Sequence, residues 1–283
     1  MTHANRTILV TGATGKQGGA LVRELAGKGF TLRAMTRNPA SDAATNLRTH
    51  GVEVVQGDLN EAGSVRQALQ GAWGVFAVQN TWDAGVEGEE TQGKQLAQLA
   101  KEAGVQHYVY ASVASADRGT GIPHFDNKSR VEDTVRSLNF PSHVIYRPVF
   151  FMENLPSPWF LSGDALVSAI EPSTVLQMIA VRDIGKYAAA CFIDADRLKG
   201  REFDIAGDER TMPETAAIMS RALGRTISYV QIPLDAVRKN SEDFALMLDW
   251  FNRVGYDVDI DATSKEFGIP PTRLEDWAAT LRA

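Results

Sequence analysis

Residues 8–18 read Ile-Leu-Val-Thr-Gly-Ala-Thr-Gly-Lys-Gln-Gly. An apolar, strand-like run leads directly into three glycines, and a helical pattern follows them. Gly12 would permit a tight turn, Gly15 would let the backbone approach a pyrophosphate, and Gly18 would let the helix lie close to the strand. The amino end of that helix offers unpaired N–H groups to phosphates. The segment therefore predicts a dinucleotide-binding loop, with a bare glycine-rich turn as the alternative. Its candidate cofactor contacts are Gly12, Thr14, Gly15, Lys16, Gln17 and Gly18.

Strand and helix patterns alternate through the first half of the chain. The predicted strands are Thr7–Thr11, Thr31–Thr36, Val52–Gln56, Trp73–Gln79, His107–Ser112 and His143–Arg147. They are apolar almost throughout, which is typical of a parallel sheet covered by helices on both faces. Segments with helical periodicity lie between them, and several end on a glycine at the C-terminal cap position. We therefore expect an α/β fold, a Rossmann-type doubly wound parallel sheet.

The pattern changes near residue 150, which predicts a second domain. Residues 1–150 would form the nucleotide-binding domain, and residues 151–283 a smaller C-terminal α/β lobe that binds substrate or a partner. Segments such as 175–195 could return to the large domain. Within the second part, the spacings Thr211–Glu214 and Thr272–Glu275 each predict a capping box at the start of a helix.

Composition narrows the class of protein. Of the 283 residues 44% are hydrophobic and 23% are charged, a balance that argues against a disordered or fibrous chain. The longest apolar run, Tyr187–Ile193, is too short to span a membrane. No apolar stretch precedes Ile8, so we expect no secretory signal and a cytoplasmic protein.

The net charge of -6 argues against a broad surface for direct nucleic-acid binding. The single cysteine, Cys191, lies in an apolar segment and is expected to be a buried structural thiol.

The residues at the end of the second predicted strand should determine whether the protein prefers NAD or NADP. An NAD enzyme places an acid there for the ribose 2′-hydroxyl, whereas this chain has Arg37 and no carboxylate between Arg33 and Ala40. A guanidinium can pair with a 2′-phosphate through its planar fork, so Arg37 favours NADP. The alternative is a solvated surface arginine. Asp58 and Leu59, after the third strand, could contact adenine, and the alternative for Asp58 is a simple helix-capping turn.

Together these motifs resemble the NmrA-like branch of the atypical short-chain dehydrogenases. The resemblance is carried by the glycine loop and by Arg37-Asn38-Pro39, Val54–Asp58, Gln92-Gly93-Lys94, His107–Ser112, His124-Phe-Asp-x-Lys128, Phe151–Leu155 and Val181–Gly185. It covers nearly the whole chain, through Leu274–Trp277. Members of this family include NADPH-sensing regulators, transcriptional co-repressors and reductases of quinones, dyes or phenylpropanoids. The resemblance implies a nucleotide-binding large lobe and a small lobe that forms much of the second site.

The expected catalytic residues are Ser112, His124 and Lys128. Ordinary short-chain dehydrogenases pair a Tyr acid with a Lys four residues later, and the Lys holds the nicotinamide ribose. Here His124 stands where the Tyr would be, and Lys128 follows one helical turn later. His124 could donate a proton, or it could be a loop histidine that is solvated or forms a cap. Lys128 is expected to contact the cofactor. Ser112 could polarise a substrate or simply form a hydrogen bond at the end of its strand.

Further candidates lie on two loops. The segment Asn80-Thr81-Trp82 follows the fourth strand and is expected to lie over the nicotinamide or the substrate entrance. Trp82 could instead plug an edge of the core. Phe150, Phe151 and Asn154 could line an aromatic acceptor pocket, with Asn154 also a candidate cofactor contact, although a Phe pair after a strand is often core. The five histidines show no ligand spacing, so we predict no metal site.

The leading interpretation is an NADPH-dependent oxidoreductase that reduces a small quinone, enone or aromatic acceptor. Water can protonate the product of hydride transfer to such an acceptor, so the missing Tyr does not exclude reduction. The alternative is a non-catalytic NADPH/NADP redox sensor or transcriptional co-regulator that acts through protein partners. Either interpretation allows a homodimer, and the sequence leaves the identity of the substrate open.

Overall fold

The chain is described by a computed structural model over residues 6–282. The first five residues, on which the expected lack of a secretory signal partly depends, lie outside this range. Two compact units share the chain. The first runs to Val113 and also includes Asp126–Arg147 and Ile184–Phe203, while the second comprises Ala114–Phe125, Pro148–Asp183 and the chain from Asp204 onward. The chain therefore passes between the two units several times.

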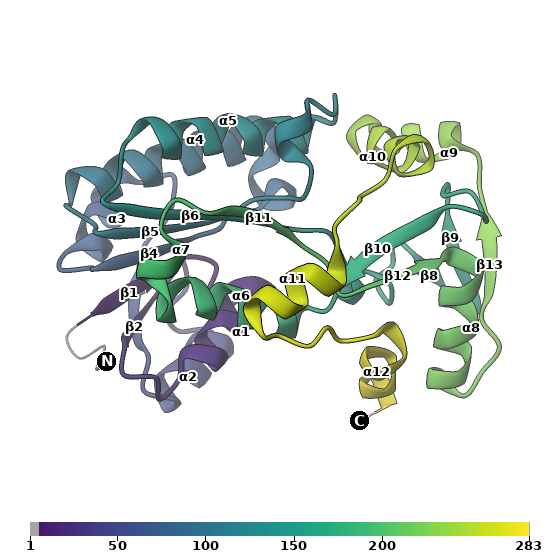
Figure 1. Cartoon of the computed structure of the whole chain (residues 1–283), viewed down its shortest axis with the longest axis horizontal. Helices are drawn as coiled ribbons and strands as arrows, with labels where there is room; N and C mark the ends of the chain where they lie inside the picture. Colours follow the sequence, from purple (N-terminus) through teal and green to yellow (C-terminus); the bar gives the residue numbers. More distant parts are fainter. Residues whose placement is uncertain (1–5, 283) are drawn as a thin grey trace. The chain divides into compact units, whose positions relative to one another are not determined.

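A seven-stranded sheet forms the centre of the first unit (Figure 1). Its strands are β1 (Thr7–Val10), β2 (Thr31–Thr36), β3 (Glu53–Gln56), β4 (Gly74–Ala77), β5 (His107–Ala111), β6 (Ser142–Pro148) and β11 (Glu202–Ile205). They follow the order β11-β6-β5-β4-β1-β2-β3, and neighbours from β3 through β6 pair in parallel. The expected Rossmann-type α/β fold is confirmed, and each of the six predicted strands is present with ends within two residues. Strand order reverses between β1 and β4, which is where ligands bind in sheets of this kind.

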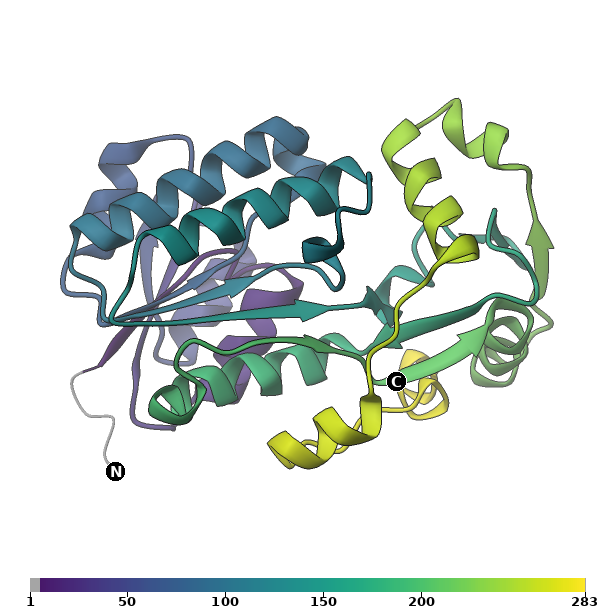
Figure 2. The same ribbon diagram turned by 45° about the horizontal axis from the view of Figure 1, so that its top comes forward.

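Helices cover both faces of this sheet. Figure 1 and Figure 2 show α3 (Ala62–Leu69), α4 (Thr81–Glu102) and α5 (Pro123–Ser137) on one face, and α1 (Lys16–Leu25), α2 (Asp42–Thr49) and α6 (Val181–Ile193) on the other. A short helix, α7 (Ala195–Leu198), follows α6. Glycines allow close contacts between neighbouring helices. A Cβ on Gly93 of α4 would lie 2.9 Å from the methyl groups of Val131 on α5, and one on Gly185 of α6 would lie 2.8 Å from Ala20 on α1.

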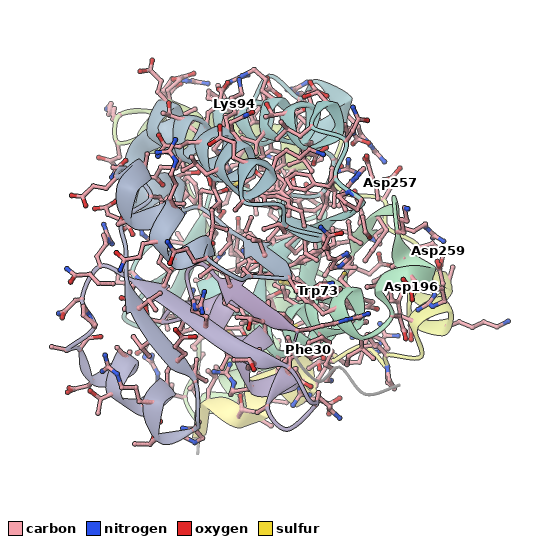
Figure 3. All side chains as sticks on the ribbon, turned by 90° about the vertical axis from the view of Figure 1, so that its left-hand side faces the viewer. Phe30, Trp73, Lys94, Asp196, Asp257 and Asp259 are labelled. Carbon is pink, nitrogen blue, oxygen red and sulfur yellow. The ribbon has the colours of Figure 1, made fainter. Side chains whose placement is uncertain are left out.

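The described core of the first unit is apolar and also includes the buried imidazole of His107. One apolar cluster joins the sheet to α3, α4 and α5 and includes Leu9, Val75, Tyr108, Leu96 and Val131. Near the amino ends of the strands, Trp73 stacks on Phe30 (Figure 3). Trp73 also stacks on His107. His107 bonds the carbonyl of Cys191 at 2.9 Å, and burial lowers the pKa of His107 to about 4. Cys191 is fully buried, and burial raises the pKa of its thiol, which confirms a structural rather than a reactive cysteine.

Two small sheets and five helices form most of the second unit. One sheet has the order β12 (Asp208–Thr211), β10 (Val175–Ile179), β7 (Phe150–Phe151), and the other has the order β13 (Ser228–Gln231), β9 (Ala165–Ser168), β8 (Leu161–Ser162). The helices are α8 (Met212–Leu223), α9 (Leu234–Arg238), α10 (Glu242–Arg253), α11 (Ile260–Phe267) and α12 (Leu274–Ala279). Over residues 6–282, no helix combines the length and apolar character needed to cross a bilayer.

One of the two predicted capping boxes is confirmed and the other is wrong. Thr211 caps α8, where its hydroxyl accepts from the N–H of Glu214 and the Glu214 side chain accepts from the N–H of Thr211. Thr272 instead lies outside α12, and its hydroxyl accepts a bond from Arg182. The carboxylate of Asp208, distant in the sequence, caps α12 by accepting from the N–H of Leu274 at 2.8 Å. A tertiary contact has replaced the local one.

Candidate functional site

The glycine loop adopts the geometry that its spacing predicts. Gly12 has a φ of +59°, and the turn is closed by the N–H of Gly15, which donates to the Gly12 carbonyl at 2.9 Å. A Cβ on Gly18 would lie 2.5 Å from that same carbonyl oxygen, so only glycine lets α1 start this close to β1. Gly15 is the N-cap of α1 and has no side chain to bond the first N–H groups of the helix. The first turn of α1 also has no acidic residue, so this end of the helix suits an anion.

The side chains around the loop hold it in place. Thr11, which sequence reasoning did not single out, accepts from the N–H of Val78 and donates to the Val78 carbonyl, both at 2.9 Å. Val78 lies just beyond β4, so this pair joins the loop to the switch point of the sheet. The predicted contact residue Gln17 accepts a bond from the hydroxyl of Tyr146 at 3.3 Å. The loop is therefore anchored from two strands besides its own.

Arg37 lies at the carboxyl end of β2, as expected, and its side chain is 67% exposed. Its Nη2 lies 3.4 Å from Oδ2 of Asp83, which is in the first turn of α4 and 56% exposed. A long contact between two exposed charges is weak and exchanges readily with solvent or another anion. Asp83 is a neighbour that the sequence pattern did not predict, because about 45 residues separate it from Arg37.

Asp58 forms a turn after β3. Its Oδ1 accepts from the N–H of Asn60 at 2.9 Å, and its own N–H donates to the hydroxyl of Ser64 on α3 at 3.0 Å. The turn alternative for the Asp58 side chain is therefore realised in the structure. The carbonyl of Leu59 accepts from Gln95 of α4 at 2.7 Å, which fixes the same loop from a second helix.

Lys128 forms an ion pair with a buried carboxylate on α4. Its Nζ lies 2.6 Å from Oε1 of Glu89, and the side chains of Lys128 and Glu89 are 11% and 1% exposed. The second oxygen, Oε2, accepts from Nδ2 of Asn127 at 3.0 Å and from the hydroxyl of Thr81. Burial alone would raise the pKa of Glu89, but the Lys128 ammonium and the hydrogen bonds outweigh it, so the pKa is lowered. Glu89 is therefore ionised at neutral pH.

Several buried polar atoms near the carboxyl ends of β4 and β5 have no hydrogen-bond partner within residues 6–282. They include both amide atoms of Gln79 and the hydroxyls of Tyr110 and Ser112. Buried polar groups in folded proteins are normally bonded, because leaving one unpaired costs about 1–3 kcal/mol. Unpaired groups gathered on adjacent strand ends are typical of a site that binds a polar ligand.

His124 belongs to the second unit and is bound by a carboxylate from α10. The backbone N–H of His124 donates to Oδ1 of Asp243 at 3.0 Å, and the ring Nδ1 lies 2.6 Å from Oδ2 of the same residue. His124 is only 8% exposed, and its ring contacts Phe125 edge-on. The alternative of a solvated loop histidine is therefore wrong. The sequence carried no signal for Asp243, which pairs across more than 100 residues.

The remaining predicted residues divide between the two units. Asn80 is the N-cap of α4, where its Oδ1 accepts from the N–H of Trp82 at 3.1 Å. Trp82 is 61% exposed, so it does not plug the core. In the second unit, Phe150 is 6% exposed and packs edge-on against two aromatic rings, which makes it a core residue. Asn154 ends the short 3-10 helix Met152–Asn154, and its carbonyl accepts from the hydroxyl of Ser157.

Within residues 6–282, no group of three or more His, Cys, Asp or Glu side chains is arranged to hold a metal ion. The glycine loop, Arg37, Asn80, Ser112 and Lys128 all lie in the first unit. The glycine loop, Arg37, Asn80 and Ser112 follow the carboxyl ends of β1, β2, β4 and β5, the edge at which cofactors bind in this fold, and Lys128 lies on α5.

The family of this chain follows from a match over almost its whole length. The model of the NmrA-like family matches residues 4–278. The chain belongs to the NmrA-like family. Among curated relatives, a (4-alkanoyl-5-oxo-2,5-dihydrofuran-3-yl)methyl phosphate reductase of Streptomyces griseus is 30% identical, over 96% of each chain. The nitrogen metabolite repression protein nmrA of Emericella nidulans is 29% identical, over 95% of this chain and 77% of its own.

Other members of the family are longer than the stretch they share with this chain. The NmrA-like oxidoreductase ptmS of Penicillium ochrochloron is 36% identical, and the match covers 54% of this chain and 50% of ptmS. The match also covers 59% of the Neurospora crassa nitrogen metabolite repression protein.

Solved structures of the same fold include enzymes and regulators. An NADPH-dependent quinone oxidoreductase of Escherichia coli, in complex with NADPH, has a TM-score of 0.82 at 23% identity and covers 98% of this chain and 100% of its own. The negative transcriptional regulator NmrA, in complex with NAD, has a TM-score of 0.81 at 24% identity and covers 98% and 95%. At these identities the likeness shows the shared fold.

Proposed function

We propose that this NmrA-like protein binds NADP(H) and reduces a small quinone, enone or aromatic acceptor with NADPH. The observation that carries the proposal is the glycine loop at the start of α1, with Arg37 on the next strand. Family membership and the reductase among its relatives support it. In this proposal the first unit binds the cofactor, and the second unit, with His124 and Asn154, binds the acceptor.

The residues of the first unit fit this cofactor along its length. The N–H groups at the start of α1 would bind the pyrophosphate, and Arg37 would pair with the 2′-phosphate. Lys128 would hold the nicotinamide ribose. The unpaired buried amide of Gln79 and hydroxyl of Ser112 supply the polar partners that the nicotinamide carboxamide needs.

Bound NADPH supplies the hydride. The protein must position the acceptor, and one proton must reach the acceptor. Lys128 fixes the ribose and therefore the orientation of the reacting ring. His124 lies one turn before Lys128 on α5, and Asp243 at its Nδ1 orients the imidazole so that Nε2 can donate the proton. For a quinone, water can supply this proton instead. The balanced reaction consumes NADPH, one proton and the acceptor, and yields NADP⁺ and the reduced acceptor.

The test is NADPH consumption with a panel of quinones, enones and aromatic aldehydes, for the wild-type protein and for Lys128→Ala. A cofactor titration in the same buffer separates inactivity from misfolding. We expect acceptor-dependent oxidation that falls at least tenfold in Lys128→Ala, since a charge-assisted bond to the ribose is lost. A protein that does not bind NADPH would contradict the proposal outright.

A second candidate is a non-catalytic NADP(H) sensor that acts through protein partners. Two relatives are nitrogen metabolite repression proteins, which favours this candidate, and so does the His124 that replaces the dehydrogenase Tyr. Tight binding of NADPH without turnover, combined with unequal affinities for NADPH and NADP⁺, would support the sensor over the reductase.

A further inference from the structure

Glu89 is a buried carboxylate to which the proposed reaction gives no role. It lies on α4 in the first unit, and its side chain is 1% exposed. A carboxylate is expensive to bury, so natural proteins bury one only where partners compensate for it. Here the compensating charge is Lys128, the residue proposed to hold the nicotinamide ribose.

The two oxygens of Glu89 have separate partners. Oε2 is fixed by two neutral donors, Nδ2 of Asn127 and the hydroxyl of Thr81, while Oε1 bonds the ammonium of Lys128 at 2.6 Å. The neutral donors hold the carboxylate, and the carboxylate in turn holds the ammonium. Nδ2 of Asn127 also donates to the carbonyl of Val86 at 2.8 Å, so the anchor is tied to the backbone of α4.

A break in α4 makes this arrangement possible. Thr81 and Glu89 are eight residues apart, which in an unbroken helix would separate their Cα atoms by about 12 Å along the axis. Gly85 lies between them with a φ of 73° and a ψ of 168°, outside the helical range. The kink folds the first turn of α4 back toward Glu89, which lets the Thr81 hydroxyl reach it.

We propose that Glu89 is a positioning residue that holds the ammonium of Lys128 against the nicotinamide ribose and neutralises its charge. A lysine has three N–H donors, and Glu89 occupies one, which leaves two for the ribose hydroxyls. In ordinary short-chain dehydrogenases the lysine charge also tunes a Tyr acid, but this chain has His124 in that place. Because Glu89 balances its charge, Lys128 binds and orients the ribose and does not tune an acid. This inference rests on the proposed function.

The test compares NADPH with 2′,5′-ADP, which contains the adenosine half of the cofactor and lacks the nicotinamide ribose. Isothermal titration measures the Kd of each ligand for the wild type and for Glu89→Gln. We expect Glu89→Gln to weaken NADPH binding about tenfold or more, because a misplaced ammonium loses charge-assisted bonds to the ribose. The Kd for 2′,5′-ADP should stay within about twofold, and the KM for NADPH should rise more than kcat falls.

Glu90→Gln is the matched control. Glu90 is the next residue on α4, pairs with Lys94 and Arg130, and has 19% of its side chain exposed. Removing its charge should leave the affinities for NADPH and for 2′,5′-ADP unchanged. Thr81→Val is a milder variant, which keeps the Glu89 charge and removes one anchor of Oε2. It should weaken NADPH binding several-fold and leave 2′,5′-ADP binding unchanged.

Glu89→Gln leaves the Lys128 charge buried without its partner, so the variant could unfold. The double variant Glu89→Gln/Lys128→Met removes both charges and should regain thermal stability while NADPH binding stays weak. An equal loss of affinity for NADPH and for 2′,5′-ADP, in variants that have the melting temperature of the wild type, would overturn the inference. So would unchanged NADPH affinity in Glu89→Gln. Neither result would affect the proposed function, which fails only if the wild-type protein does not bind NADPH or reduce an acceptor.

Discussion

Arg37 is the residue on which cofactor preference depends. Its guanidinium lies at the end of β2 and makes a loose contact with Asp83, 3.4 Å away. If it pairs with the 2′-phosphate, Arg37→Ala should weaken NADPH binding about tenfold to a hundredfold and leave NADH binding nearly unchanged, since a charged hydrogen bond contributes about 1.5–3 kcal/mol. Fluorescence titration with both cofactors measures this. Arg66→Ala, which removes another exposed arginine, is the control. An equal loss of affinity for NADPH and NADH in Arg37→Ala would contradict the assignment.

Asp83 should act against the same phosphate. Its carboxylate competes for Arg37 and repels the dianion, so Asp83→Asn should tighten NADPH binding by up to about fivefold at low salt. NADH carries no 2′-phosphate and should bind as before. Titrations at two ionic strengths would show the effect, which should shrink as salt is added. A weaker NADPH affinity in Asp83→Asn would mean that this carboxylate contacts the cofactor itself.

At the scale of elements, the start of α1 depends on Gly18. A Cβ there would lie 2.5 Å from the Gly12 carbonyl, a backbone atom that cannot move without opening the loop. Gly18→Ala should therefore cost about 1–3 kcal/mol of unfolding free energy and reduce NADPH affinity. Gly63→Ala is the control, because a Cβ on this α3 residue meets nothing within 4 Å. Chemical denaturation and cofactor titration of the two variants should separate them, and equal behaviour would refute the packing role of Gly18.

The capping box of α8 offers a test far from the cofactor. Thr211→Ala removes the acceptor of the Glu214 N–H and should lower the free energy of unfolding by about 1 kcal/mol. NADPH affinity should not change, because α8 lies in the second unit. A change in NADPH affinity at unchanged stability would show that α8 has a part in cofactor binding.

Elements were predictable where their determinants are local. The apolar runs and the glycine loop gave the strands of the large sheet and the turn at Gly12, because strand propensity and positive φ are properties of a few adjacent residues. The cap of α12 was not predictable, since Asp208 replaces Thr272 through a tertiary contact. Glu89 and Asp243 were missed for the same reason. Each is an ordinary surface acid in sequence, and only the folded chain brings it to Lys128 or His124.

At the scale of the whole molecule, acid should destabilise the fold through two kinds of group. Hydrogen bonds from Arg136 lower the pKa of Glu202 to about 2 against the opposing effect of burial, and Arg147 adds to the shift. A carboxyl with a lowered pKa stabilises the fold above its unfolded pKa, and that stability is lost as pH falls through the folded value. His107, whose pKa burial lowers to about 4, binds its proton more readily when unfolded, so stability also falls below about pH 6.5.

The free energy of unfolding should therefore decrease steadily from about pH 6.5 toward pH 2. Urea denaturation at a series of pH values measures it. Glu202→Gln should flatten the part of the curve below about pH 4.5. A profile in which this variant keeps the wild-type slope would show that the Arg136 and Arg147 contacts do not persist in solution.

The central claim is that this chain reduces an acceptor with NADPH, and a single-turnover experiment tests it most directly. Protein in excess over NADPH is mixed with a quinone, an enone or an aromatic aldehyde, and the loss of reduced-nicotinamide absorbance is followed. We predict oxidation by at least one acceptor class at least about a thousandfold faster than in buffer without protein, at a rate that saturates with acceptor concentration. NADPH that is shown to be bound, yet is oxidised no faster than in buffer by any of the three classes, would contradict the claim.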